Sequence, residues 1–325
     1  MLSRVAYSIY WLTRYIERAE NVARFVDVNL NLLLDSPIGT AGQWDPLISV
    51  SGDRALFQTL YNGEATSKNA LNFLTFDRRC PNSVISCVRA ARENARSVRE
   101  TISSEMWEQL NAFYLMVEDA AKAVTISDIG ELCTFYAEVK MASHRFSGVM
   151  NATQSWNESW HFGRLGRLLE RADKTARILD VKYFLLLPSP QEVGTPLDNL
   201  QWIALLKSAS AHEMYRKTQH KISPAGVASF LIFDPHFPRT IKFCLHRAED
   251  SLRCIIGSED SSMASQRALG RLRAEIDYGT IEEIFQVGLH EFLDDLQRRI
   301  NQVGDCIYTD FIAIPQPSPV LSQAQ

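Results

Sequence analysis

Residues 12–28 read LTRYIERAENVARFVDV, and residues 165–181 read LGRLLERADKTARILDV. Nine of the seventeen aligned positions are identical. The apolar positions vary among Ile, Leu, Phe and Val, but the charged positions are retained: the matched pairs are Arg14/Arg167, Glu17/Glu170, Arg18/Arg171, Glu20/Asp173, Arg24/Arg177 and Asp27/Asp180. The chain therefore carries one charged helical pattern twice.

The first of these segments lies within a long apolar repeat. Apolar residues recur at steps of three and four from Leu2 to Leu33, until Pro37 and the glycines after it. This spacing is typical of a helix that packs in a bundle, and proline ends such a helix. The sequence predicts one long helix whose apolar face consists of Leu2, Val5, Ile9, Leu12, Ile16, Ala19, Ala23, Val26, Leu30 and Leu33.

The repeat continues beyond this helix. Residues 73–87 read FLTFDRRCPNSVISC, residues 230–244 read FLIFDPHFPRTIKFC, and Trp44 is matched by Trp202. We expect each half to contain a long helix, a second helix around the tryptophan, an irregular loop, a third long helix and a closing helix. The polar residues after Pro81 and Pro238 suit the start of the third helix. The closing helices are expected over roughly 129–153 and 281–305.

These patterns predict an all-α fold, a helical bundle built from two tandem pseudo-symmetric repeats. The repeats cover about 1–155 and 156–312, and only 151–156 resembles a break between them. We therefore expect one domain over 1–312 with a shared core. Residues 313–325 are rich in Pro, Ser and Gln and are predicted to be a disordered tail.

Composition excludes several classes of protein. The net charge is −4, whereas a general nucleic-acid binder has an excess of Lys and Arg. No apolar run is long enough to span a membrane, and charged residues interrupt the N-terminal segment before a signal peptide could form. The six cysteines form no Cys-x-x-Cys pair; they indicate reduced thiols and a cytoplasmic protein. Cys87 and Cys244 are predicted to lie in the apolar core.

Two interpretations of the charged helices stay open. Glu17, Glu20 and Arg24 share one helical face, and the corresponding residues of the second copy do the same. If the two helices meet, their side chains form either a buried ion-pair network that fixes how the helices dock or a pocket for an anionic ligand or a metal. The residues proposed to bind a ligand here are Arg14, Arg18, Arg167 and Arg171, and the proposed acid/base residues are Glu17, Glu20 and Glu170.

A second constellation occurs in the first half only. Arg89, Arg92, Arg96 and Arg99 recur at steps of three and four on the third predicted helix, where the second half has His246, Glu249, Arg253 and Ile256. This pattern suits either an anion site or a solvated helix face with intrahelical Arg89–Glu93 and Arg96–Glu100 pairs. A weaker metal hypothesis rests on Glu283, His290 and Asp294, which share one helical face; we expect no metal site.

Three segments resemble a known family, the bacterial alpha-E proteins. They are MLSRVAYSIYWLTRYIERAENVAR from Met1, ARENARSVRETISSEMWEQLN over 91–111, and GRLLERADKTARILDVKY over 166–183. The resemblance covers nearly all of 1–310, and its Glu-Arg motif falls at Glu17-Arg18 and Glu170-Arg171. Within ARENAR it points to Arg92, Glu93, Asn94, Arg96 and, one turn later, Arg99 as ligand-binding residues.

The resemblance implies a context more than a mechanism. Such proteins are typically encoded beside, or fused to, circularly permuted ATP-grasp proteins, often with a transglutaminase-like protein nearby. We therefore expect a component of an ATP-grasp-linked system that forms or modifies peptide or amide bonds and binds a carboxylate, phosphate or aminoacyl group. If the chain is an enzyme, an acyl-transfer or ligase reaction is expected; it would need no cofactor of its own, because ATP and Mg²⁺ belong to the partner ligase. The alternatives are a non-catalytic scaffold for that ligase and a metal-dependent helical enzyme.

Overall fold

The computed structural model describes residues 1–35, 44–123, 128–185, 196–219, 221–257 and 263–313, and within these ranges the chain is all-α. The helices before residue 154 are α1 (Ser3–Asp35), α2 (Trp44–Ser51), α3 (Arg54–Tyr61), α4 (Ser67–Thr75), α5 (Val84–Ser97), α6 (Ser104–Ala123) and α7 (Ile129–Thr153). Those that follow are α8 (Glu158–Leu185), α9 (Pro196–Ser208), α10 (His212–Thr218), α11 (Pro224–Phe233), α12 (Ile241–Ile256), α13 (Ala264–Tyr278), α14 (Ile281–Val287) and α15 (Leu289–Phe311).

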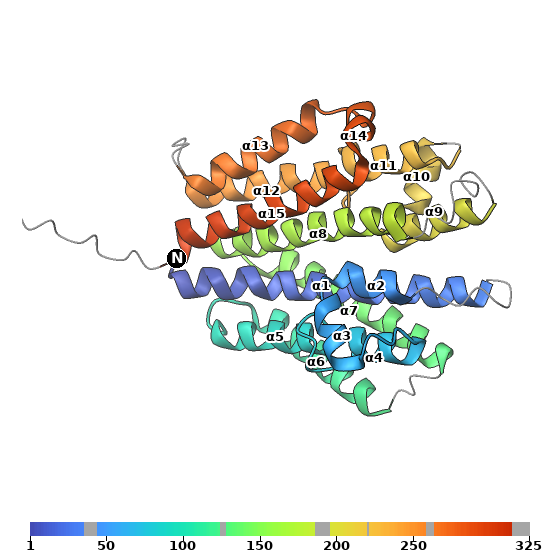
Figure 1. Ribbon diagram of the computed structural model, residues 1–325. Coiled ribbons are helices and arrows are strands. Elements are labelled where there is room, and N and C mark those ends of the chain that lie inside the picture. The colour runs from blue at the N-terminus through green and yellow to red at the C-terminus, as the bar shows by residue number, and fades with distance from the viewer. Residues whose placement is uncertain (36–43, 124–127, 186–195, 220, 258–262, 314–325) are drawn as a thin grey trace, which may run out of the picture.

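The two helices that carry the charged repeat, α1 and α8, lie side by side in the middle of the molecule (Figure 1). Helix α1 packs against α5 and α7 as well, and α8 packs against α12 and α15. Helices α6 and α13 complete the two groups by packing on α5 and α7 and on α12 and α15. The same order of helices thus surrounds α1 and α8; that the two groups are copies of one unit stays a prediction from the sequence.

The apolar face predicted for α1 forms its buried side. Val5, Ile9, Leu12, Ile16, Ala19, Ala23, Val26 and Leu30 are all buried in the core. Leu2 is exposed, contrary to the prediction, because it precedes the first turn of the helix at the chain end. The side chain of Leu33 lies outside the described residues. Cys87 and Cys244 are buried as predicted, and burial raises the pKa of both thiols to about 12.

Helices α1 and α8 run in the same direction and approach each other closely at two glycines. The Thr13 hydroxyl donates to the carbonyl oxygen of Gly163 at 2.7 Å. A Cβ atom added to Gly166 would lie 2.3 Å from the backbone oxygen of Tyr10, and one added to Gly163 would lie 3.2 Å from Thr13 Cγ2. Only residues without a side chain permit this spacing, which brings the charged side chains of both helices within bonding distance.

Local signals locate several helix starts. Ser83 caps α5 by accepting from the backbone N–H of Ser86, and Thr240 caps α12 by accepting from that of Phe243. These are the polar positions that the sequence predicts as helix starts after Pro81 and Pro238. The closing helix over 129–153 is confirmed as α7.

Other boundaries were predicted wrongly. The second helix expected around Trp44 is three short helices, α2 to α4, which include part of the supposed irregular loop. Helices α6 and α13 were not predicted. The closing helix over 281–305 is broken at Gly288, whose φ of +110° is incompatible with a continuous helix, and is resumed as α15. Helix α5 ends at Ser97, so Arg99 lies beyond it.

Two further predictions concern membrane spans and the C-terminal tail. No helix among the described residues combines the length and the apolar character that crossing a membrane requires. The tail predicted over 313–325 lies, from residue 314 onward, outside the described residues.

Candidate functional site

The Glu-Arg pairs of α1 and α8 exchange ion pairs. Arg18 donates from Nε and Nη2 to the two carboxylate oxygens of Glu170, at 2.6 and 2.9 Å. Arg171 donates in the same way to Glu17, at 2.8 and 2.7 Å. Each arginine binds the glutamate of the opposite helix in the planar, bidentate geometry that gives the strongest Arg–carboxylate contacts.

The sequence explains why this exchange is reciprocal. Adjacent residues of a helix are rotated by about 100° from each other, so a Glu-Arg pair presents opposite charges on two neighbouring faces. When two such helices run in parallel, the glutamate of each meets the arginine of the other, on opposite sides of the contact. The condition that the sequence left open, that the two charged helices meet, is thereby fulfilled.

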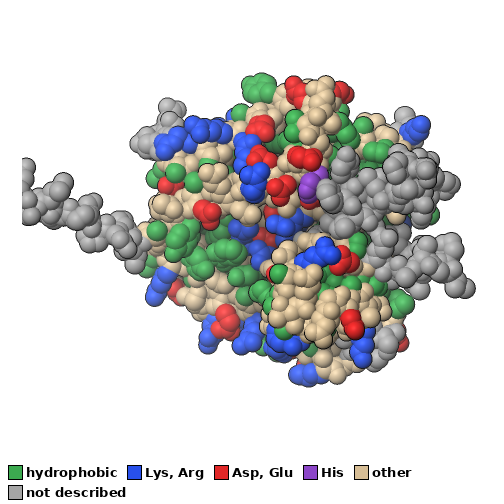
Figure 2. Space-filling model, viewed as in Figure 1, with side chains coloured by type: hydrophobic (Ala, Val, Ile, Leu, Met, Phe, Trp, Pro, Cys, Tyr) green, Lys and Arg blue, Asp and Glu red, His purple; other side chains and the backbone are tan. Residues whose placement is uncertain are grey.

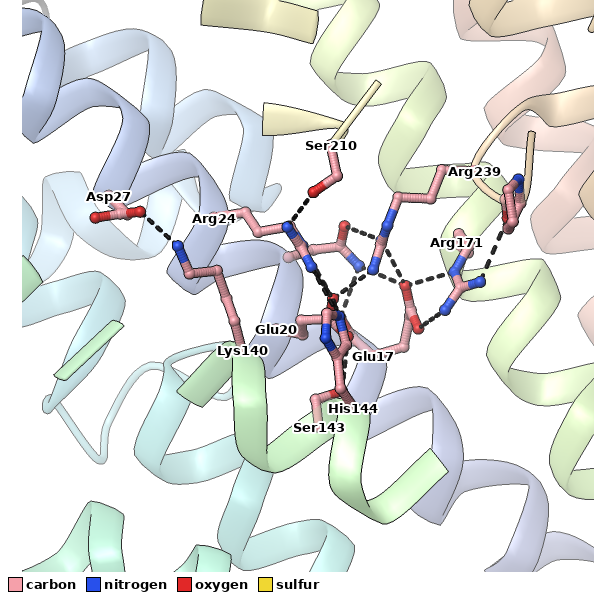
Figure 3. A network of polar contacts seen from close by, with 12 residues as sticks. Glu17, Glu20, Arg24, Asp27, Lys140, Ser143, His144, Arg171, Ser210 and Arg239 are labelled. Atoms are coloured by element: carbon pink, nitrogen blue, oxygen red, sulfur yellow. Dashed lines mark hydrogen bonds and ion pairs between the residues drawn. The ribbon is translucent and has the colours of Figure 1, made fainter. Parts of the chain in front are cut away.

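On one side of this contact lies a cluster that we call the Glu17 centre, formed by Glu17, Glu20, Arg24, Arg171 and Arg239 (Figure 3). Arg239, from the loop before α12, donates to Glu17 at 3.0 Å and also binds Glu20. Arg24 donates from Nε to Glu20 at 2.9 Å and contacts the Ser210 hydroxyl.

Helix α7 closes the Glu17 centre. The Ser143 hydroxyl donates to Glu20 at 2.6 Å. The imidazole Nε2 of His144 lies 3.1 Å from the same carboxylate and 3.0 Å from Arg24. Half of the His144 side chain is exposed, whereas Glu20 is buried, so this side of the centre faces solvent.

On the other side lies the Glu170 centre, formed by Glu170, Asp173, Arg14, Arg18, Lys174 and Arg177. Arg14 donates to Glu170 at 2.9 Å and packs over the Trp11 ring at 4.8 Å. Lys174 lies 3.7 Å from Glu170 and 3.4 Å from Asp173, and Arg177 donates to Asp173 at 2.8 Å. Figure 2 shows charged side chains of both signs gathered along the junction of the two helix groups, beside a hydrophobic patch.

The electrostatics keep these carboxyl groups ionised. Burial alone would raise the pKa of Glu170, but Arg18, Arg14 and Lys174 outweigh it and hold that pKa well below its usual range. The pKa of Glu20 is likewise low, because Arg239, His144 and Arg24 outweigh burial. Arg171 and Arg239 lower the pKa of Glu17 in the same way.

This arrangement does not suit the acid/base role that the sequence left open for Glu17, Glu20 and Glu170. Both oxygens of each carboxylate already accept hydrogen bonds from side chains of the protein. A general base needs a free oxygen and a pKa near the working pH. The geometry instead gives these carboxylates the task of positioning guanidinium groups.

The low pKa values predict how stability depends on pH. Because the folded-state pKa of all three glutamates lies below the ordinary value of 4.5, the unfolded chain takes up protons first as the pH falls. The ion pairs therefore contribute fully above about pH 6, and this contribution is lost as the pH falls through 4.5 and below. Urea denaturation followed by circular dichroism between about pH 7 and 3 measures it. A free energy of unfolding that stays constant over that range would contradict the prediction.

Arg167, the counterpart of Arg14, has no ion pair with a carboxylate among the described residues. Its Nε is buried without a hydrogen-bond partner in the part of the chain that the structure describes. Burial and the nearby charge of Arg171 lower the pKa of Arg167 to about 10. Arg14 binds the Glu170 oxygen that also accepts from Arg18 Nη2. Arg239 instead binds the Glu17 oxygen that accepts from Arg171 Nε, which corresponds to the Glu170 oxygen near Lys174.

The arginine stripe of the first half lies elsewhere. Arg92 donates to Asn111 at 2.8 Å and lies over the rings of Trp107 and Tyr114, all on α6. The polar contacts of Arg92 are with Asn111 of α6 and with Glu93. Glu17 instead accepts from Arg171 of α8 and from Arg239 of the loop before α12. The structure therefore does not bring Arg92 to the Glu17 centre.

The remaining members of the stripe have local partners or face solvent. Arg96 pairs with Glu93 at 2.6 Å, in place of the expected pair with Glu100. Arg99 lies over Trp107 at 5.5 Å, and Asn94 donates to the backbone oxygen of Ala90. Arg89 is exposed.

A metal site finds no support in the described part of the chain, where no group of three or more His, Cys, Asp or Glu side chains is placed to hold an ion. His290, one of the three candidate ligands, lies 2.6 Å from Asp180 of α8.

The sequence patterns did not indicate Arg239 or the three residues that contact the Glu17 centre from other elements. Arg239, Ser143, His144 and Ser210 come from elements distant in the sequence and share no motif with α1. One signal was available: Arg239 replaces Asn82 at the same position of the repeated loop. Asn82 instead accepts from Arg18 at 2.6 Å and donates to Asp53.

Comparison with known proteins identifies the family. The family model of Alpha-E, described as a predicted alpha-helical domain with a conserved ER motif, matches residues 1–312. The chain belongs to the Alpha-E family, and its reciprocal Glu-Arg pairs fit that description.

Two relatives are uncharacterized proteins, Rv2567 of Mycobacterium tuberculosis and Mb2597 of Mycobacterium bovis. Each is 24% identical over 343 residues, which cover 96% of this chain and 37% of the relative. The chain thus spans little more than a third of the length of these relatives. No solved structure matches the chain.

Proposed function

We propose that this chain is the anion-binding component of an ATP-grasp-linked system that forms or modifies peptide or amide bonds, and that it holds a carboxylate, phosphate or aminoacyl group beside the paired Glu-Arg helices. ATP and Mg²⁺ would be bound by the separate ATP-grasp partner, with a transglutaminase-like protein as a further partner. The cytoplasm is the compartment in which such a ligase finds ATP.

The observation that carries the proposal is an excess of positive charge. The Glu170 centre has two carboxylates and four cationic groups, Arg14, Arg18, Lys174 and Arg177. In the Glu17 centre, Glu17 and Glu20 face Arg24, Arg171 and Arg239, with Arg167 close enough to interact electrostatically. Buried cations without matching carboxylates favour the binding of an anion.

The context of the proposal comes from the family and from the relatives. Members of this family are typically encoded beside or fused to ATP-grasp proteins, and the two mycobacterial relatives have more than half of their length outside the matched part. That length leaves room for a fused partner.

A second candidate is a non-catalytic scaffold that docks the ligase. It is favoured by the observation that the oxygens of Glu17 and Glu170 are already occupied by donors of the chain itself. The exposed Arg89 and Arg96 of α5 would then belong to the docking surface.

Reconstitution with the ATP-grasp partner tests the proposal and separates the two candidates. We expect amide product to require this chain and a phosphate- or carboxylate-bearing substrate to bind to the chain alone in a calorimetric titration. Unchanged product formation without the chain would refute both candidates. A requirement for the chain without any binding of anions, together with loss of the complex in an Arg89→Ala/Arg96→Ala variant, would favour the scaffold.

A further inference from the structure

Arg167 differs from the cations of the two centres because no carboxylate among the described residues pairs with it. Arg14, Arg18, Lys174 and Arg177 each pair with a carboxylate of the Glu170 centre. Arg24, Arg171 and Arg239 each pair with one of the Glu17 centre. For Arg167 the described residues provide neither an ion pair nor a hydrogen bond to its buried Nε.

The surroundings of Arg167 sharpen this contrast. One turn away on the same face of α8 lie two further arginines, Arg164 and Arg171. Arg164 lies 3.4 Å from the Ser251 hydroxyl, packs over the Trp160 ring and is close enough to Asp250 to interact electrostatically. The indole Nε1 of Trp160 is also buried without a partner among the described residues. This face of α8 therefore presents two buried donors, Arg167 Nε and Trp160 Nε1, that have no acceptor in the described part of the chain.

The two copies of the sequence repeat differ in the loop residue that contacts the Glu-Arg pairs. In the first copy, the loop before α5 contributes the neutral Asn82, and Arg14 is free to bind Glu170. In the second copy, the loop before α12 contributes Arg239, which binds both Glu17 and Glu20. The second copy thus has one more arginine bound to its carboxylates, while Arg167 has no ion pair among the described residues.

Resting on the proposed function, we infer that the anion site lies at the Glu17 centre, is organised by Arg167, and takes a phosphoryl dianion. The charge balance favours a dianion over a single carboxylate, because Arg24, Arg167, Arg171 and Arg239 exceed Glu17 and Glu20 by two charges. Arg167 is partly exposed and the nearby His144 is half exposed, so a small anion can approach from solvent. Guanidinium groups bind phosphate oxygens in pairs.

Arg167→Gln tests this site, with Arg273→Gln of α13, a partly buried arginine outside both centres, as the matched control. Binding of inorganic phosphate, a phosphomonoester and acetate is measured by calorimetry at low salt, and the melting temperature is measured with and without each anion. We expect phosphate and the phosphomonoester to bind wild type and Arg273→Gln with similar affinity, acetate to bind more weakly, and Arg167→Gln to bind phosphate at least about tenfold more weakly.

The melting temperature without anion provides a second readout, because it is expected to change in opposite directions in the two variants. Removing a positive charge that lies beside Arg171 and has no ion pair among the described residues is expected to raise it in Arg167→Gln, whereas Arg273→Gln, which breaks a pair with Glu249, is expected to lower it. Loss of phosphate binding in Arg273→Gln alone, or a lowered melting temperature with unchanged binding in Arg167→Gln, would overturn the inference but leave the proposed function standing. Absence of binding of all three anions to wild type would overturn the inference and remove the main support of the proposed function. Binding of free phosphate but not of the phosphomonoester would identify inorganic phosphate as the ligand.

Discussion

Replacing Glu170 by Gln is expected to cost about 3–5 kcal/mol of unfolding free energy, because the change leaves buried cations without their partner. Glu170 is fully buried and accepts from Arg14 and Arg18, with Lys174 nearby. A typical domain has only about 5–15 kcal/mol of stability, so this variant is expected to unfold at markedly lower urea concentration.

The control for this variant is Glu93→Gln, which removes the partner of Arg96 in an exposed pair of α5. Exposed pairs contribute at most about 1 kcal/mol, so its midpoint is expected to stay near that of wild type. Urea denaturation at pH 7 gives both midpoints. Equal stabilities of the two variants would contradict the interpretation of Glu170 as the anchor of a buried network.

Gly166→Ala is expected to destabilise the protein by about 1–3 kcal/mol or more, although alanine favours helices. The added Cβ would lie 2.3 Å from the backbone oxygen of Tyr10 and 3.0 Å from the Thr13 hydroxyl. A backbone atom cannot swing aside, so α1 and α8 must separate. Their separation also lengthens the Arg18–Glu170 and Arg171–Glu17 contacts.

Gly148→Ala of α7 is the matched control. No atom lies within 4 Å of a Cβ built there, so this variant is expected to be neutral or to gain up to about 1 kcal/mol from helix propensity. Thermal denaturation of both variants checks the prediction. A Gly166→Ala variant as stable as Gly148→Ala would show that the two helices do not meet at the glycines.

The sequence was sufficient for the parts of this structure that depend on periodic patterns. The apolar spacing of α1 located its buried face, and the repeated Glu-Arg pattern identified the charged residues of α1 and α8, although it left open whether the two helices meet. The sequence also left open whether these charged residues form an ion-pair network or a ligand site. The structure describes a buried ion-pair network in which one cation, Arg167, has no partner among the described side chains. A ligand site beside that network stays a proposal.

The parts that failed depend on contacts between distant segments. The surroundings of Arg92 could not be predicted because α6, which provides the Asn111 and Trp107 that Arg92 contacts, had not been predicted. Arg239 was missed because a loop residue shows no periodicity. Its effect depends on reaching across to α1, which only the folded chain reveals.

The most direct test of the central claim, that the reciprocal Glu-Arg pairs clamp α1 to α8, is a double-mutant cycle of Arg18→Gln and Glu170→Gln measured by urea denaturation. The two side chains are bonded at 2.6 and 2.9 Å, and such contacts show coupling of about 0.5–3 kcal/mol. We predict a coupling energy near the top of that range, with the double variant more stable than the sum of the single losses implies. Losses that add to within about 0.5 kcal/mol would contradict the claim.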